Sequence, residues 1–203
     1  MSQAAALRFR IFIKELRWLD ASGRPGHELD LYDKKATHIA ILDETGKIIA
    51  YVRMWRRETQ GFMLEKEFRA LRQKPELLAD IQTEIAELSR LAIEPAFQGS
   101  MVFFELYYAM YRWSCQNRVR YWICVVNRIF LRSLYSVFKL HYTVIGKRDE
   151  TTAVLIPIRQ FRWWAVLMRI WHRFRAIASF LHLPTKSIAR LIFRGHFRER
   201  SVE

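Results

Sequence analysis

Two β-branched, apolar segments lie on either side of a short polar turn, and this pattern restricts the chain to folds that contain an antiparallel hairpin. The segments are Thr37–Leu42 and Ile48–Trp55. The turn between them reads DETGK, and Gly46 can adopt the positive φ that a tight turn requires. A later strand is predicted over Glu87–Ile93 (ELSRLAI), where residues alternate as in a strand before the Glu94–Pro95 pair. The hairpin therefore has to join a sheet with later strands.

Helical and strand patterns alternate along the rest of the chain. Apolar residues spaced three or four apart predict helices over residues 5–19, 65–81 (interrupted at Pro75), about 100–117 and 128–138. Further strands are predicted over Arg120–Val126, His141–Ile145 and Thr152–Ile158. The sequence SGRPG at Ser22–Gly26 is expected to close the first helix. This order predicts an α/β domain with one mixed central sheet flanked by helices.

The composition is that of a globular domain with a strongly basic surface. Hydrophobic residues make up 51% of the 203 residues, and 34 Lys or Arg against 20 Asp or Glu give a formal net charge of +14. Such a surface attracts polyanions, namely nucleic acid, anionic lipid or an acidic protein. Two cysteines, Cys115 and Cys124, are too few for a disulfide framework or a zinc pattern. We find no secretory signal and no long apolar run, and therefore expect a cytoplasmic protein.

Three carboxylates stand within the seven residues HELDLYD of this basic chain. They are Glu28, Asp30 and Asp33. Because like charges repel, arginines are expected to neutralise them, and Arg–carboxylate pairs also fix geometry because they are planar and bidentate. The candidate partners are Arg8, Arg10 and Arg53. The alternative is a solvated acidic turn; a metal site is not predicted, since no regular EF-hand spacing occurs.

Ten residues, from the first predicted helix to the strand ELSRLAI, occur in the order and at the spacing of a known signature. They are Arg8, Phe12, Trp18, Glu28, Asp30, Asp33, Arg53, Phe68, Glu87 and Arg90. In these positions the chain resembles the acyl-homoserine lactone synthases (autoinducer synthases), a family of GNAT-like acyltransferases. The resemblance covers roughly the first half of the sequence. The phrase ELSRLAI, with Leu91 after Arg90, also resembles the related long-chain N-acyl amino acid synthases.

The second half is similar to the wider GNAT superfamily. Leu134–Gly146 (LYSVFKLHYTVIG) resembles its segment of helix end, turn and strand, with Lys139 in place of the usual glycine and Leu140 in place of Phe. The sequence EPAFQGS resembles the loop that binds acyl-coenzyme phosphates, with Gly99 alone of the usual glycines. The resemblance implies a GNAT-like acyltransferase domain over residues 1–158.

The resemblance also implies an activity. A fatty acyl group would move from an acyl carrier protein thioester, or from acyl-CoA, to the amine of S-adenosylmethionine, giving an N-acyl-homoserine lactone signal for quorum sensing. The alternative is an N-acyl amino acid synthase whose acceptor is a free amino acid. No tightly bound cofactor is implied, and the basic surface suits the acidic carrier protein as a partner. An oligomer is compatible with the sequence.

Individual residues acquire roles under this resemblance. The expected substrate-binding residues are Arg8, Phe12, Trp18, Glu28, Asp30, Asp33, Arg53, Phe68 and Arg90. Glu87 is the candidate general base, and pairing with an arginine such as Arg90 is the alternative. Tyr135 is the candidate general acid for the leaving thiolate, and packing within a helix is the alternative. Backbone N–H groups near Leu91–Ile93 would polarise the thioester carbonyl where the strand bulges.

Residues 159–203 form a basic extension that the resemblance does not cover. They contain ten Lys or Arg and two acidic residues, a net charge of +8. Residues 161–182 predict an amphipathic helix with a broad apolar face, and a second helix is predicted from Thr185. That face contains Trp163, Leu167, Ile170, Trp171, Phe174, Ile177, Ala178 and Leu181, and Arg162, Arg169 and Arg173 lie opposite. Either residues 160–203 lie on an anionic membrane, at its inner face, or they pack on the sheet or in a dimer.

A hypothesis of another class is a non-catalytic protein that binds a membrane or nucleic acid through the same fold. Nucleic acid is not expected as a partner, because no recognised module is present. The aromatic residues of the extension also share the aliphatic face instead of alternating with arginines as stacking platforms. Release of thiol from an acyl thioester in the presence of an acceptor would separate the enzyme from the binding protein.

Overall fold

The computed structural model describes residues 1–19, 26–56, 61–67, 76–79, 81–148 and 150–180. The chain forms two compact units, Met1–Gln160 and Phe161–Glu203. Three predicted features lie wholly or mostly outside the described residues: the turn SGRPG, the site residue Phe68 and the helix from Thr185.

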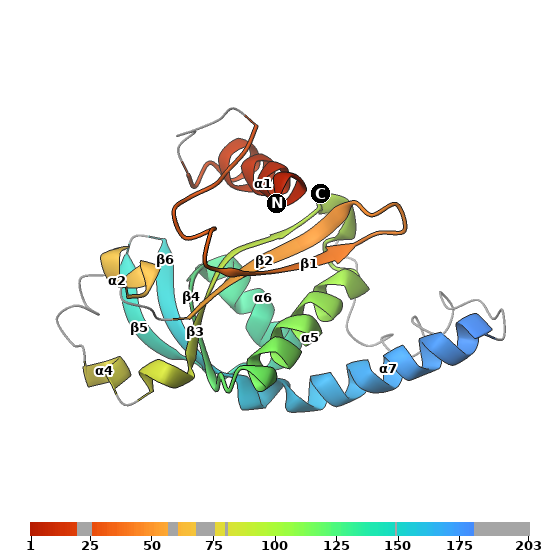
Figure 1. The fold of residues 1–203 in the computed structure, drawn as a ribbon. Coiled ribbons are helices and arrows are strands. Elements are labelled where there is room, and N and C mark those ends of the chain that lie inside the picture. Colours follow the sequence, from red (N-terminus) through yellow and green to blue (C-terminus); the bar gives the residue numbers. More distant parts are fainter. Residues whose placement is uncertain (20–25, 57–60, 68–75, 80, 149, 181–203) are drawn as a thin grey trace, which may run out of the picture. The chain divides into compact units, whose positions relative to one another are not determined.

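Six strands of the first unit form one mixed sheet in the order β1-β2-β3-β4-β6-β5 (Figure 1). The strands are β1 (Thr37–Leu42), β2 (Ile48–Arg56), β3 (Ile85–Ile93), β4 (Tyr121–Asn127), β5 (Thr143–Arg148) and β6 (Thr151–Pro157). Only β3 and β4 run parallel, and all other neighbours are antiparallel. The predicted α/β class with a mixed sheet is confirmed, and Gly46 has a φ of 80° in the hairpin turn.

The helices also follow the predicted order. They are α1 (Ser2–Arg8), continued as a π-helix over Phe9–Glu15, then α2 (Met63–Glu67), α4 (Glu76–Ala79), α5 (Met101–Gln116), α6 (Arg128–Phe138) and, in the second unit, α7 (Arg162–Phe180). Short 3-10 turns occupy Gln82–Glu84, Pro95–Phe97 and Ile158–Phe161. None of the helices in the described part of the chain is long and apolar enough to cross a membrane.

Two predicted elements have different bounds in the structure. Of the helix predicted over 65–81, the described residues contain α2, which begins at Met63, and α4, which ends at Ala79, and residues 68–75 lie outside the description. The strand predicted over His141–Ile145 begins at Thr143. The reason is that the Gln160 side-chain amide occupies the backbone of His141, bonding its N–H at 2.6 Å and its carbonyl at 2.7 Å.

The two faces of the sheet are covered by different helices. In Figure 1, α1 lies over one face, where it contacts β2 and β3, and α5 lies over the other, where it contacts β1 and β2. Because side chains alternate along a strand, Tyr51, Arg53 and Trp55 of β2 all point to the α1 face. Polar residues of β2 therefore lie under the N-terminal helix, and this face carries the candidate site.

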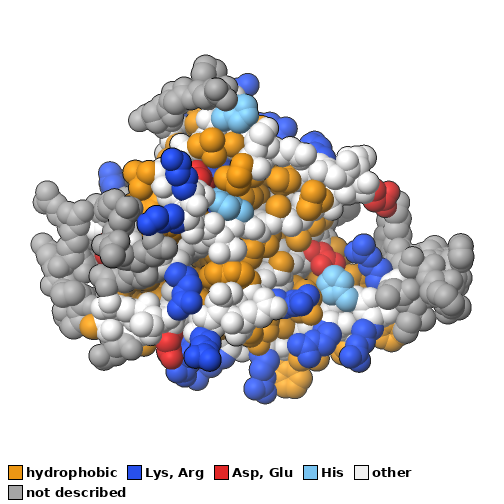
Figure 2. Space-filling view, viewed as in Figure 1, with side chains coloured by type: hydrophobic (Ala, Val, Ile, Leu, Met, Phe, Trp, Pro, Cys, Tyr) orange, Lys and Arg blue, Asp and Glu red, His pale blue; other side chains and the backbone are white. Residues whose placement is uncertain are grey.

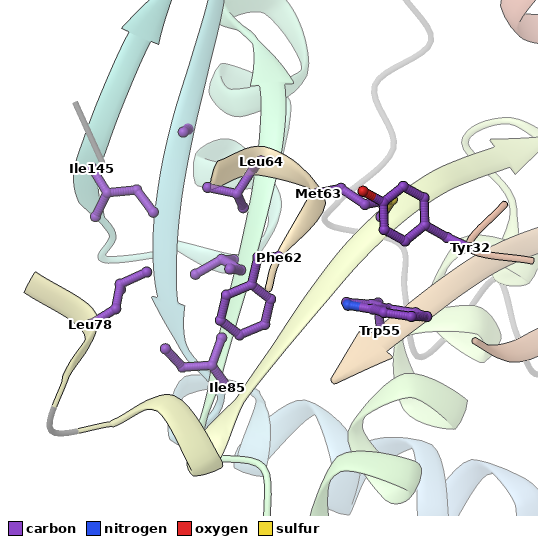
Figure 3. Packing of buried hydrophobic residues seen from close by; sticks show 10 residues of the cluster. Tyr32, Trp55, Phe62, Met63, Leu64, Leu78, Ile85 and Ile145 are labelled. Carbon is purple, nitrogen blue, oxygen red and sulfur yellow. The ribbon is translucent and has the colours of Figure 1, made fainter. Parts of the chain in front are cut away.

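The core on the α1 face is a cluster of buried side chains from strands and short helices. Figure 3 shows Phe62 and Leu64 lying over the sheet, close to Ile85 of β3 and Ile145 of β5. Trp55 meets Tyr32 edge to face, with ring centroids 5.2 Å apart. The cluster consists of Tyr32, Trp55, Phe62, Met63, Leu64, Leu78, Ile85, Ile123, Ile145 and Ala153. It fixes the segment around residue 63 against the sheet, beside the polar residues of β2 and β3.

Candidate functional site

Three arginines and three carboxylates form a closed ring of alternating charge on the α1 face of the sheet. Arg8 and Arg53 are fully buried, with exposed side-chain fractions of 0%. The ring runs Arg8–Glu28–Arg90–Asp30–Arg53–Asp33 and back to Arg8, and each carboxylate bonds two arginines. We call these six residues the ion-pair ring. The sequence predicted that arginines would neutralise the three carboxylates, and in the structure each carboxylate forms ion pairs with two arginines.

Arg8 and Arg53 provide the buried part of the ion-pair ring. Arg8 donates to Asp33 from both Nη atoms, at 2.6 and 3.2 Å, and from Nε to Glu28 at 2.5 Å. Arg53 Nη1 donates to Asp30 at 2.6 Å and to Asp33 at 2.9 Å. The fork of the Arg8 guanidinium thus fixes the orientation of the Asp33 carboxylate as well as its position.

Arg90 closes the ring in a role for which the sequence proposed Arg10. Arg90 donates from Nε to Glu28 at 3.0 Å and from Nη2 to Asp30 at 3.2 Å. The expectation for Arg10 is wrong, because Arg10 bonds Glu94 at 2.5 Å and its side chain is 43% exposed. Two positions along a helix are separated by about 200°, so Arg8 and Arg10 cannot both face the acidic segment.

A bulge in β3 brings Arg90 to the ion-pair ring. In a regular strand Glu87 and Arg90 would point to opposite faces. The register between β2 and β3 shifts between Tyr51 and Arg53, so that one extra residue of β3 is inserted at Arg90–Leu91. Arg90 has a φ of 57°, in the left-handed region that costs a non-glycine residue about 1–2 kcal/mol. The predicted bulge is confirmed, and it places Arg90 on the face that carries Arg53.

The acidic segment is also ordered by its own backbone. The Asp33 carboxylate accepts the N–H of Asp30 at 2.7 Å, and the Asp30 carboxylate accepts the N–H of Tyr32 at 2.9 Å. The N–H of Glu28 donates to the carbonyl of Ala5 in α1 at 3.1 Å. Short acidic side chains favour such local turns, which explains why Asp occupies positions 30 and 33.

The electrostatics of the ion-pair ring favour the charged form of its members. Burial alone would raise the pKa of Asp33, but hydrogen bonds from Arg8 and the Asp30 amide, with the charges of Arg8 and Arg53, lower it to about 2. Burial opposes the charge of Arg8, yet its bond to Asp33 and the charge of Glu28 raise its pKa. The pKa of Arg53 is raised in the same way by Asp30 and Asp33 against the effect of burial. Asp33, Arg8 and Arg53 are therefore ionised at neutral pH.

Two aromatic signature residues, Phe12 and Trp18, lie on the Arg90 side of the ion-pair ring. Phe12 is buried, and the Arg90 guanidinium lies 6.0 Å from its ring centroid. Trp18 lies 6.3 Å from Phe12, ring to ring, and is 51% exposed. Leu29 and Leu31, which flank Asp30 in the sequence, are also exposed. A polar ring edge beside exposed apolar side chains is a suitable wall for a small amphipathic molecule.

Glu87 is buried on β3 and holds the α2 segment. Its carboxylate accepts backbone N–H bonds from Met63 at 2.6 Å and from Leu64 at 3.1 Å. These bonds use one lone-pair direction on each oxygen, so the described geometry gives Glu87 an anchoring role. Pairing with Arg90 was the alternative from sequence, whereas the bonds of Arg90 described above go to Glu28 and Asp30.

Strands β3 and β4 separate next to these residues. Their parallel pairing runs from Ile85–Tyr121 to Leu88–Cys124, although β3 continues to Ile93 and β4 to Asn127. Beyond Leu88 the two strands share no further pairing, and the separation begins where the bulge of β3 begins. The backbone of Leu91–Ile93 lies in this separated part of β3.

The sequence of the site region identifies the family. Residues 7–108 match the family model described as an acetyltransferase (GNAT) domain. The chain belongs to the GNAT acetyltransferases. This membership makes it an N-acyltransferase, as the resemblance implied. No curated protein matches the chain by sequence.

Solved structures show the same fold in both enzyme groups that the sequence resembles. LasI, an AHL synthase, is 24% identical with a TM-score of 0.60, over 77% of this chain and 82% of LasI. BjaI, a CoA-dependent acyl-homoserine lactone synthase solved with MTA, is 18% identical with a TM-score of 0.62, over 90% and 82%. FeeM, an N-acyl amino acid synthase from uncultured soil microbes, is 13% identical with a TM-score of 0.57, over 80% and 92%. This GNAT chain therefore shares the fold of both groups.

Tyr135, the other proposed catalytic residue of this GNAT domain, lies on α6. Its side chain is more than half exposed, so the alternative of packing within a helix is not what the structure shows. The Lys139 ammonium lies 5.6 Å from its ring centroid. Lys139, at the usual glycine position, has a φ of 51° and ends α6 in the left-handed conformation that glycine adopts more readily.

A separate pocket of about 310 Å³ lies between α1 and the β1–β2 turn. It is lined by Gln3, Ala6, Leu7, Arg10, Thr45, Gly46, Lys47, Ile48 and Glu94. Glu94 bonds both Arg10 and Lys47 there. No group of three or more His, Cys, Asp or Glu side chains suited to a metal ion occurs in the part of the chain that the structure describes.

The sequence missed three polar residues that support the ion-pair ring. Tyr51 accepts from Arg8 at 3.4 Å, and its hydroxyl lies 2.6 Å from His38 Nδ1. His38 Nε2 lies 2.8 Å from the carbonyl of Asp33, which can only accept, so Nε2 carries the proton. Ser89 accepts from Arg53 Nε at 3.0 Å. For Tyr51 the sequence did contain a signal, because the alternation of side chains along β2 places Tyr51 on the same face as Arg53.

Proposed function

We propose that this GNAT acyltransferase moves a fatty acyl group from an acyl carrier protein thioester to the amine of S-adenosylmethionine, giving an N-acyl-homoserine lactone. The observation that supports this proposal is the closed ion-pair ring, because six of the ten signature residues form it. The solved relative BjaI with SAM and isopentyl-CoA supports S-adenosylmethionine as acceptor and an acyl thioester as donor, and the relatives solved with MTA agree with that acceptor.

The exposed edge of the ion-pair ring suits an amino-acid moiety. Asp30 and Arg90 are its most exposed members, with exposed side-chain fractions of 24% and 22%. A carboxylate and a guanidinium side by side complement the α-ammonium and α-carboxylate of the acceptor. Trp18, half-exposed beside Phe12, would supply an aromatic face for the sulfonium cation.

The proposed reaction is aminolysis of a thioester. The acceptor amine loses a proton and attacks the carbonyl carbon, and the thioester C–S bond breaks with the thiolate taking up a proton. With S-adenosylmethionine as acceptor, its α-carboxylate then attacks the γ-carbon of the same molecule, the C–S bond at the sulfonium breaks, and methylthioadenosine leaves as the lactone closes. Backbone N–H groups of Leu91–Ile93 would stabilise the oxyanion, where β3 and β4 have separated. Glu87, which lies on β3 and whose carboxylate is held by the Met63 and Leu64 amides, would accept the amine proton directly or through water. Tyr135 would protonate the thiolate.

The net positive charge suits an anionic acyl donor. A net charge of +14 steers a small acidic carrier protein to the surface, and the phosphates of acyl-CoA would be attracted by the same charge. The cytoplasm supplies both donors. BjaI is described as CoA-dependent, so the carrier protein and CoA have to be compared directly.

A second candidate keeps the chemistry and changes the acceptor to a free amino acid. The likeness to FeeM, over 92% of that protein, favours it, and so does the ring edge, because an amino acid carries the same ammonium and carboxylate. The two candidates differ in the side chain that would meet Trp18 and Phe12.

The test is turnover by the purified chain with acyl carrier protein or CoA thioesters, and with S-adenosylmethionine or a panel of amino acids. Thiol release and mass spectrometry of the product identify donor and acceptor. Asp30→Asn should lower kcat/KM about 10- to 100-fold, the value of one charge-assisted hydrogen bond. Glu84→Gln, which loosens an exposed pair with Arg120, is the control. Absence of thiol release with every acceptor, or full activity of both Asp30→Asn and Glu87→Gln, would contradict the proposal.

A further inference from the structure

Helix α7 carries a line of exposed apolar side chains. Trp163 is 71% exposed, and four more large apolar residues on the helix are exposed as well. The line consists of Trp163, Val166, Leu167, Ile170 and Phe174. Their spacing of three and four residues places them along one side of the helix. The apolar face predicted from the sequence was broader and included Trp171, which is buried and does not belong to this line. The side chains from residue 176 onward lie outside the description.

A line of arginines runs beside the apolar line. Arg162, Arg169 and Arg173 are exposed and are separated by seven and four residues. At about 100° per residue they lie roughly a quarter turn from the centre of the apolar line. Figure 2 shows Lys and Arg side chains (blue) next to hydrophobic ones (orange) along the edge where Figure 1 draws α7. The sequence of Arg162–Phe180 contains no acidic residue.

This combination points to one kind of partner. A continuous exposed apolar line is unfavourable in water and marks a surface that another apolar phase covers. A second copy of α7 would bring arginine lines together with no acid on the helix to neutralise them. An anionic bilayer offers an apolar phase directly beneath negative headgroups, and at this boundary Trp and Arg side chains are both stable.

We propose that α7 lies flat on an anionic membrane surface, with the Trp163–Phe174 line in the boundary between headgroups and acyl chains and the arginines on the phosphates. The net charge of +8 on residues 159–203 adds attraction over a range of about 8 Å at physiological salt. This goes beyond the proposed acyl transfer, which does not require it.

Flotation of the full-length protein with vesicles tests the proposal. We expect the protein to float with vesicles of phosphatidylcholine and phosphatidylglycerol, to stay behind with phosphatidylcholine alone, and to be released by high salt. Leu167→Glu with Ile170→Glu should abolish flotation. Replacing Arg162, Arg169 and Arg173 with Gln should weaken binding about fivefold per arginine, or about 100-fold together.

The control removes the same charge elsewhere. Arg112, Arg128 and Arg132 are exposed on α5 and α6, and their replacement with Gln should weaken binding far less. Equal binding of the two triple variants, unchanged flotation of the double glutamate variant, or equal flotation with neutral vesicles would overturn the proposal. A parent protein that binds no vesicles and sediments as a dimer, with a double glutamate variant that sediments as a monomer, would also overturn it. Thiol release without vesicles should persist in all α7 variants, which separates this test from that of the acyl transfer.

Discussion

Replacing Arg8 with methionine would remove one corner of the ion-pair ring while keeping most of the side-chain length. Arg8 is fully buried and bonds Glu28 and Asp33 at once. The ring has three positive and three negative members, so the substitution leaves one buried negative charge in excess. Removing one partner of a buried ion pair costs about 3–5 kcal/mol. Asp33 retains Arg53 and Glu28 retains Arg90, so we expect the lower end, about 3 kcal/mol.

The matched control is the same substitution two positions along the chain. Arg10 is 43% exposed and pairs with Glu94, which also has Lys47, so Arg10→Met should cost at most about 1 kcal/mol. For a chain of this size, 1 kcal/mol corresponds to about 2–4 °C in the unfolding midpoint. The expected fall in Tm is therefore about 6–12 °C for Arg8→Met and at most about 4 °C for Arg10→Met.

Thermal unfolding followed by circular dichroism, with urea unfolding for the free energy, measures both variants. A double-mutant cycle with Asp33→Asn should show a coupling between positions 8 and 33, because part of the loss comes from the unpaired carboxylate. Equal shifts for Arg8→Met and Arg10→Met would refute the reasoning, since they would mean that the buried ring is worth no more than an exposed pair.

Three further predictions concern stability at acid pH, the reactivity of the two thiols and the role of Arg90. The pKa of Asp33 is about 2 in the folded protein, against an ordinary value of 3.8. Its contribution of about 2 kcal/mol to the free energy of unfolding should therefore be present above pH 4 and disappear as the pH falls toward 2. The free energy of unfolding of Asp33→Asn should depend less on pH in this range, and an equal pH dependence of the two proteins would contradict the prediction. Burial, with the charge of Glu87, raises the pKa of Cys124 to about 12, so a thiol reagent at neutral pH should modify only exposed Cys115 until the protein is denatured. Arg90→Lys should lower kcat/KM at least about tenfold, because lysine cannot bridge Glu28 and Asp30 with a fork, and unchanged kinetics would remove Arg90 from the acceptor site.

The candidate site was predicted from sequence as a set of residues, and the structure shows which of them meet. All six members of the ion-pair ring were named from the signature. Arg10 was paired with the wrong region, because helical geometry decides which of two nearby arginines faces inward. Glu87 was predicted to be the general base, with pairing to an arginine as the alternative, and its described bonds go to the backbone of α2, a contact that no local pattern encodes.

Local sequence determined the hairpin, the order of helices and strands, and the presence of an acidic segment in a basic chain. These features depend on side-chain periodicity and on turn residues such as Gly46, which act over a few positions. Tertiary structure decided the closure of the ion-pair ring and the separation of β3 from β4. The closure depends on the bulge at Arg90, whose cost of about 1–2 kcal/mol is offset by contacts with Glu28 and Asp30, some sixty residues earlier in the chain. A local pattern cannot contain that balance, because the stabilising partners are distant in sequence and adjacent only in the fold.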